Sequence, residues 1–138
     1  MTPSQLELVR ASYATLPDGG AAMAADFYRY LFELAPRTRA LFATEPDAMA
    51  VKFSAELAAI VEAITSYETF APRVSELAVR HNGYGVRPQH YRTVGQALIR
   101  ALAAHLDEDW DEELEAAWRR AYNLVSELMM TAAGDAQR

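Results

Sequence analysis

Apolar residues recur along most of this chain at steps of three and four residues, which is the spacing of one face of an α-helix. This pattern predicts helices over about 3–16, 21–35, 46–67, 72–81 and 88–106 and after Trp110, with a shorter element over 36–42. Alternation of apolar and polar residues between turn residues, which would indicate a strand, appears nowhere in the sequence. We therefore expect an all-α fold of about seven helices.

Prolines and glycines mark the expected helix ends. Thr2, directly before Pro3, is expected to cap the first helix, and the turn-forming run Leu16-Pro17-Asp18-Gly19-Gly20 should end it. Because proline is favoured in the first turn of a helix, five of the six prolines predict helix starts: Pro3, Pro36, Pro46, Pro72 and Pro88.

Length and composition limit the classes of protein to which this chain can belong. The 138 residues fit one domain, 1–138, with about 132–138 as a frayed tail. A net charge of −6 argues against nucleic acid as a partner, and the absence of cysteine excludes disulfides and thiolate metal ligands. The N-terminus does not resemble a signal peptide, and no segment is apolar enough to cross a bilayer. We therefore expect a cytoplasmic protein without a membrane partner, as a monomer or homodimer.

Two groups of potential metal ligands have simpler interpretations. Seven acidic residues surround the start of the last helix, where negative charge is favoured by the helix dipole, and we interpret them as a solvated cap: Asp107, Glu108, Asp109, Asp111, Glu112, Glu113 and Glu115. The three histidines, at 81, 90 and 105, do not have the spacing of a zinc site. Nucleophile-elbow and glycine-rich phosphate-loop motifs are also absent.

The remaining candidate is His81, which continues the apolar stripe of Leu77 into the last turn of its expected helix. A neutral imidazole at a helix end can point into an apolar space and coordinate iron. A lone histidine at such a position is more often a capping or partly exposed residue. Taken singly, aromatic residues and methionines at helical spacing are also usually core residues: Tyr28, Phe42, Met49, Phe53, Tyr91 and Trp118.

The order of these residues changes that interpretation. The chain contains Phe27-Tyr28-x-x-Leu31-Phe32, then Leu41-Phe42, then His81-x-x-x-x-Val86-x-Pro88-x-x-Tyr91-x-x-Val94-Gly95, and finally Ala117-Trp118-Arg119-Arg120-Ala121-Tyr122. In order and spacing these strings resemble the bacterial globins, most of all the single-domain relatives of the haem domain of flavohaemoglobins. The resemblance runs from about Thr2 to Met130 and implies the globin fold and a haem. Without cysteine to form thioether links, the haem would be haem b, bound non-covalently.

The resemblance also implies roles for individual residues. His81 matches the proximal ligand, which binds the iron through Nε2, and Phe42 matches the phenylalanine that packs flat on the porphyrin. Tyr28 matches the distal tyrosine, whose phenol can donate a hydrogen bond to bound O₂. Further cofactor-binding positions of the same motif fall on Val86, Tyr91 and Val94.

Two positions depart from the family pattern. The chain is about three residues shorter after Phe42, so the distal position that often holds glutamine falls on Met49, and the apolar one falls on Phe53. Met49 could ligate iron through its thioether, but packing over the distal face is the preferred interpretation. On the proximal side, Tyr91 matches a tyrosine whose glutamate partner would fall on Ala133, with Asp135 the nearest acid.

Three functions remain open at this point. A haem globin could bind O₂, CO and NO reversibly and, with an external reductase, act as an NO dioxygenase. Alternatively, the chain could be a haem-based gas or redox sensor that acts through a protein partner. A haem-free helical bundle that binds proteins is the third possibility. Haem binding separates the last from the other two.

Overall fold

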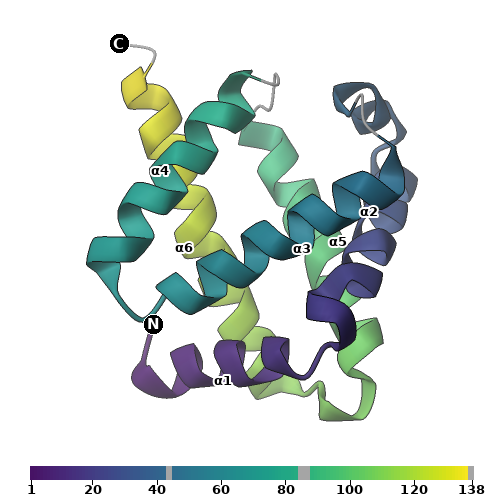
Figure 1. The fold of residues 1–138 in the computed structure, drawn as a ribbon, viewed down its shortest axis with the longest axis vertical. Coiled ribbons are helices and arrows are strands. Elements are labelled where there is room, and N and C mark those ends of the chain that lie inside the picture. Colours follow the sequence, from purple (N-terminus) through teal and green to yellow (C-terminus); the bar gives the residue numbers. More distant parts are fainter. Residues whose placement is uncertain (43–44, 84–87, 137–138) are drawn as a thin grey trace.

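The computed structural model describes residues 1–42, 45–83 and 88–136, with the backbone alone for 46, 67, 79, 81–83, 88 and 132–136. Every regular element in these ranges is helical, which confirms the all-α prediction (Figure 1). The elements are α1 (Pro3–Ala14), η1 (Pro17–Gly20), α2 (Ala21–Leu34), η2 (Pro36–Leu41), α3 (Pro46–Ala63), α4 (Tyr67–Gly83), α5 (Pro88–Leu106), η3 (Asp107–Asp109) and α6 (Glu112–Ala136). None of the helices in the described ranges is long and apolar enough to span a membrane.

Side-chain caps begin the first and last helices as the sequence predicts. Thr2 Oγ1 accepts a hydrogen bond from the Gln5 N–H at 3.1 Å, and Gln5 Oε1 accepts one from the Thr2 N–H at 3.0 Å. At the start of α6, Asp111 Oδ1 accepts a hydrogen bond from the Leu114 N–H at 2.7 Å. Among the described residues no group of three or more acids and histidines could hold a metal ion. Of the acidic run, Asp111 caps α6 through its side chain.

The prediction that Pro72 begins a helix is wrong. The long helix α3 ends at Ala63, and α4 already starts at Tyr67, so Pro72 lies inside α4. Proline inside a helix removes one backbone hydrogen bond, a cost that burial of neighbouring side chains can outweigh. Phe70 and Val74 flank Pro72 on α4, and their side chains are 1% and 0% exposed. Tertiary packing therefore decides where α4 begins.

Helix α2 packs against α3 and α5. Its buried stripe consists of Met23, Ala24, Phe27, Tyr28 and Leu31. Helix α6 packs against α1, α4 and α5. Figure 1 shows that α3 and α4 diverge from the short turn that joins them. The faces of α2 and α3 that meet carry the residues of the candidate site.

The loop before α2 is fixed by Tyr13. The Tyr13 hydroxyl lies 2.8 Å from the Gly19 carbonyl oxygen and 2.9 Å from that of Ser54, so it ties α1, η1 and α3 together. Gly20 has φ +88°, and a Cβ on it would lie 2.7 Å from the Tyr13 hydroxyl. Glycine is required at this position both by the backbone conformation and by the close approach of the phenol. The start of α2 is thereby set relative to α3.

A second close contact sets the crossing of α5 and α6. A Cβ on Gly95 would lie 2.6 Å from Cε2 of Tyr122, so the Tyr122 ring packs directly on the α5 backbone. The Tyr122 hydroxyl donates to the Tyr91 carbonyl oxygen in the first turn of α5. The backbone of α6 is helical through Ala136, so it includes most of the segment 132–138 that we expected as a frayed tail.

Candidate functional site

Five aromatic side chains meet where α2, the end of η2 and α3 come together, and we call them the aromatic cluster: Phe27, Tyr28, Phe32, Phe42 and Phe53. The Phe53 ring stacks on Phe27, with centroids 4.4 Å apart and planes 11° apart. Tyr28 makes edge contacts with Phe42 at 5.4 Å and with Phe53 at 5.8 Å. The structure therefore brings together three residues that the sequence resemblance assigns to one site: Tyr28, Phe42 and Phe53.

Tyr28 is the polar group of this cluster. Its side chain is buried, and burial raises the pKa of its phenol to about 12, so the hydroxyl keeps its proton at neutral pH. Within the part of the chain that the structure describes, this hydroxyl has no hydrogen-bond partner. A free donor on a side chain that is otherwise packed among aromatic rings suits a small ligand that carries an acceptor atom.

Phe42 and Phe53 give the cluster an apolar surface. Both rings are half-buried, although each packs against the core through Tyr28 or Phe27. Met49 lies one helical turn before Phe53 on α3, and its side chain is 6% exposed. This burial favours the packing role expected for Met49, and metal ligation by its thioether stays a prediction. The cluster can therefore hold a flat apolar group beside one hydrogen-bond donor.

The expected proximal residues lie on α4 and α5. His81 belongs to the last turn of α4, as predicted, and its side chain lies outside the described residues. Val86 also lies outside them. Tyr91 and Val94 are half-buried in the first turns of α5, and burial raises the pKa of Tyr91. The side chains of Ala133 and Asp135 are not described, so the expected contact between an acid and Tyr91 stays a prediction.

Sequence reasoning missed the contacts that hold α2 in place behind the cluster. His105 Nε2, near the end of α5, lies 2.7 Å from Asp26 Oδ2 on α2. The hydrogen bond from His105 is the main reason that the pKa of Asp26 is lowered. Two residues from Tyr28, the Tyr30 ring contacts the guanidinium groups of Arg29 and Arg100, which lie 4.7 Å and 4.3 Å from its centroid. These contacts fix the rotation of α2 and therefore the direction of Tyr28.

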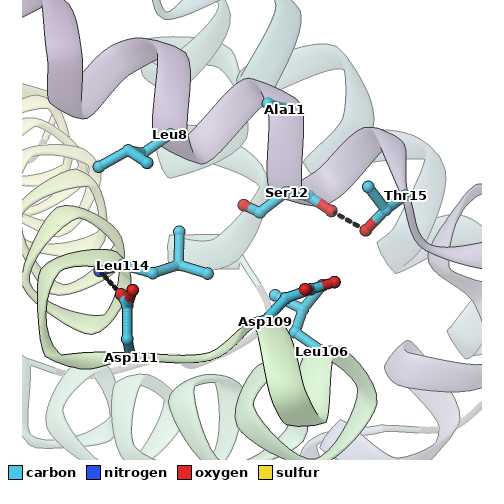
Figure 2. Close-up of a pocket in the computed structure, with 8 residues that line it drawn as sticks. All are labelled: Leu8, Ala11, Ser12, Thr15, Leu106, Asp109, Asp111 and Leu114. Carbon is cyan, nitrogen blue, oxygen red and sulfur yellow. Dashed lines mark hydrogen bonds between the residues drawn. The ribbon is translucent and has the colours of Figure 1, made fainter.

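A groove of about 230 Å³ lies elsewhere, between α1 and the segment that joins α5 to α6 (Figure 2). Its polar groups already serve the fold. Ser12 Oγ accepts a hydrogen bond from Trp118 Nε1 at 3.0 Å, and Thr15 Oγ1 donates to the Ser12 carbonyl oxygen at 2.7 Å. Asp111, on the groove's edge, caps α6. We therefore place the candidate site at the aromatic cluster rather than in this groove.

Comparison with known proteins identifies the family of this chain. The sequence model of the globin family matches residues 25–129, which include the whole aromatic cluster. A flavohaemoprotein from Halalkalibacterium halodurans is 27% identical over 131 residues, which cover 90% of this chain and 31% of that protein. The chain thus spans about a third of the length of this curated relative.

Solved structures show the same arrangement of helices. An engineered carbene transferase from Rhodothermus marinus, described as a candidate nitric oxide dioxygenase, is 30% identical with a TM-score of 0.89. The alignment covers 99% of this chain and 96% of that one. A bacterial globin from Campylobacter jejuni is 21% identical, with a TM-score of 0.86 and 99% of each chain covered, and supports the fold alone.

Proposed function

Because the chain belongs to the globin family, we propose that it is a haem globin that binds O₂ and other diatomic ligands reversibly. One observation supports this function above the others, the buried Tyr28 phenol with no partner among the described residues. Tyr28 gives the fold the contacts of its ring, whereas its hydroxyl makes no hydrogen bond within the described residues and remains available to a ligand that accepts one.

The residues fit a haem of the b type. The chain has no cysteine for thioether links, and the half-buried rings of Phe42 and Phe53 offer apolar surface to a porphyrin. His81, from the last turn of α4, would hold the iron through Nε2. When bound, the haem supplies an iron that coordinates small diatomic molecules. Val86, Tyr91 and Val94 would complete the cofactor site.

Tyr28 would select among these ligands. Its phenol stays protonated, because burial raises its pKa to about 12, and it donates to the outer atom of a ligand that carries partial negative charge. A hydrogen bond to a charged acceptor contributes about 1.5–3 kcal/mol, which is roughly ten- to hundred-fold in retention. O₂ develops more negative charge than CO when it binds, so Tyr28 should favour O₂.

We further propose that the protein oxidises NO to nitrate with O₂, with electrons from a separate reductase. This proposal is supported by the flavohaemoprotein relative and by the description of the Rhodothermus marinus protein. Neither Met49 nor Phe53 can act as a general acid. Rearrangement to nitrate needs no general acid, whereas cleavage of a peroxide does. A reductase would be needed for sustained turnover, because the haem must be reduced again after each cycle.

Absorption spectra of the purified protein in the ferric, ferrous and CO-bound states test the haem proposal first. A Soret band that shifts with each state is expected, and a protein that takes up no haem would contradict it. Mixing the O₂-bound protein with NO and measuring nitrate tests the chemistry. Sustained turnover should require an added reductase. Failure with every reductase, together with a partner that binds one haem state only, would favour a sensor instead.

A further inference from the structure

Glu56 joins the two diverging helices α3 and α4 through two arginines. Its Oε2 lies 3.6 Å from Nη2 of Arg73, and its Oε1 lies 3.5 Å from Nη2 of Arg80. Arg73 and Arg80 are two helical turns apart on α4, so their side chains come from the same face of that helix. One carboxylate thus contacts two guanidinium groups, one through each oxygen. We call this arrangement the Glu56 bridge.

The bridge is partly shielded from water. The Glu56 side chain is 25% exposed, whereas Glu62, also on α3, is 75% exposed and pairs with Arg10 of α1 at 3.9 Å. The Oε1 atom of Glu56 is buried and makes no hydrogen bond within the described residues, so Arg80 is the charge that balances it. Solvent and salt screen such a pair less than a fully exposed one. The Arg73 and Arg80 side chains are 42% and 54% exposed, so salt still weakens the bridge.

The position of the bridge connects it to the candidate site. Phe53 precedes Glu56 by one turn of α3, and His81 directly follows Arg80 on α4. Figure 1 shows these two helices separating with distance from their joining turn. In the described residues no other ion pair connects α3 with α4. The bridge is thus the electrostatic tie that lies next to both residues expected on opposite faces of the haem.

We propose that Glu56 is a positioning residue that holds α3 and α4 at the separation needed to retain haem, and so slows haem release. The inference rests on the proposed function, because it assumes a haem between these helices. When the carboxylate is neutralised, the two arginines lose their shared partner and α4 is free to move away from α3. Opening of the helix pair then exposes the cofactor to solvent.

The test is the rate of haem loss from the ferric holoprotein to an excess of a haem-scavenging apoglobin. Glu56→Gln should release haem about three- to tenfold faster than the wild type, as expected for two partly exposed ion pairs. Glu62→Gln is the matched control on the same helix and should change the rate less than twofold. Raising NaCl from about 0.05 to 1 M should accelerate haem loss from the wild type more than from Glu56→Gln.

A second variant separates the bridge from general stability. Arg80→Gln should also speed haem loss. The double variant Glu56→Gln/Arg80→Gln should lose haem more slowly than the sum of the two single effects predicts, because both substitutions remove the same ion pair. Tyr13→Phe is the control for stability, because it should lower the free energy of unfolding and yet change the rate of haem loss less than twofold. Haem loss that follows unfolding stability across all variants would overturn the proposal.

Failure of the proposed function and failure of the bridge proposal would give different results. A wild-type protein without a Soret band would remove the proposed function and the role of the bridge together. A wild type with a normal Soret band and an unchanged rate of haem loss in Glu56→Gln would overturn the bridge alone.

Discussion

Tyr13 at the end of α1 and Tyr28 in the middle of α2 have similar environments and different uses. Both side chains are buried, and burial raises both pKa values to about 12. The Tyr13 hydroxyl lies within 2.9 Å of two backbone carbonyl oxygens, whereas that of Tyr28 has no partner among the described residues. Tyr122 resembles Tyr13, because its hydroxyl donates to the Tyr91 carbonyl oxygen.

The difference teaches how a structural tyrosine can be told from a functional one. Residue type, burial and pKa do not separate Tyr13 from Tyr28, and only the partner of the hydroxyl does. A tyrosine that holds the fold has its hydrogen bond inside the protein. A tyrosine that serves a ligand keeps its donor free in a cluster whose other members are apolar. We expect the two classes to respond oppositely to loss of the hydroxyl.

The largest expected effect comes from removing the haem itself. His81→Ala should abolish the Soret band or leave a loosely held haem with an altered spectrum, because it deletes the proposed axial ligand. His105→Gln, near the far end of α5, is the control and should retain the haem and its Soret band, because it removes no proposed iron ligand. An unchanged ferrous–CO spectrum in His81→Ala would mean that another residue ligates the iron.

The structural half of the comparison is tested by Tyr13→Phe. This change leaves the carbonyls of Gly19 and Ser54 without the phenol, so the free energy of unfolding should fall by about 1–3 kcal/mol. Urea unfolding monitored by circular dichroism measures the change. Gas binding should be unaffected, because Tyr13 is not part of the aromatic cluster. A Tyr13→Phe variant as stable as the wild type would show that its hydroxyl does not hold the fold.

The smallest expected effect concerns the pair that fixes α2 behind Tyr28. The His105 hydrogen bond lowers the pKa of Asp26, with a smaller contribution from Arg29, so Asp26 stabilises the fold while it is ionised. That contribution is present above the unfolded pKa, near 3.8, and is lost as the pH falls through the lower folded value. Because the pair is partly exposed, we expect less than about 1 kcal/mol.

Urea midpoints of the wild type and Asp26→Asn, measured between about pH 7 and pH 2, test this contribution. The wild type should be more stable at neutral pH, and the difference should vanish at the acid end. A difference that persists at the lowest pH would show that Asp26 acts through packing rather than charge.

The sequence predicts most helix ends where a local signal sets them. The Thr2–Gln5 capping box and the cap at Asp111 depend on residues three apart, so they can be recognised without a structure. Pro72 misleads, because burial of Phe70 and Val74 outweighs the preference of proline for a first turn. Long-range packing of this kind leaves no mark in the local sequence.

Some features of the candidate site could be predicted from the sequence and others could not. The resemblance to bacterial globins assigns Tyr28, Phe42 and Phe53 to one site, and the structure brings their rings together. The stacking of Phe53 on Phe27, the Asp26–His105 pair and the Glu56 bridge could not be predicted, because each joins residues from different helices. Such pairs depend on how the helices cross, and the periodicity of a single helix does not specify a crossing.

The most direct test of the proposed function compares O₂ and CO dissociation rates in the wild type and Tyr28→Phe. Loss of the donor should speed O₂ release by roughly tenfold or more and CO release far less, because CO develops less negative charge. Because the Tyr28 hydroxyl makes no hydrogen bond within the described residues, the variant should unfold at about the same urea concentration as the wild type. Equal changes for both gases, or a loss of stability like that of Tyr13→Phe, would contradict the account.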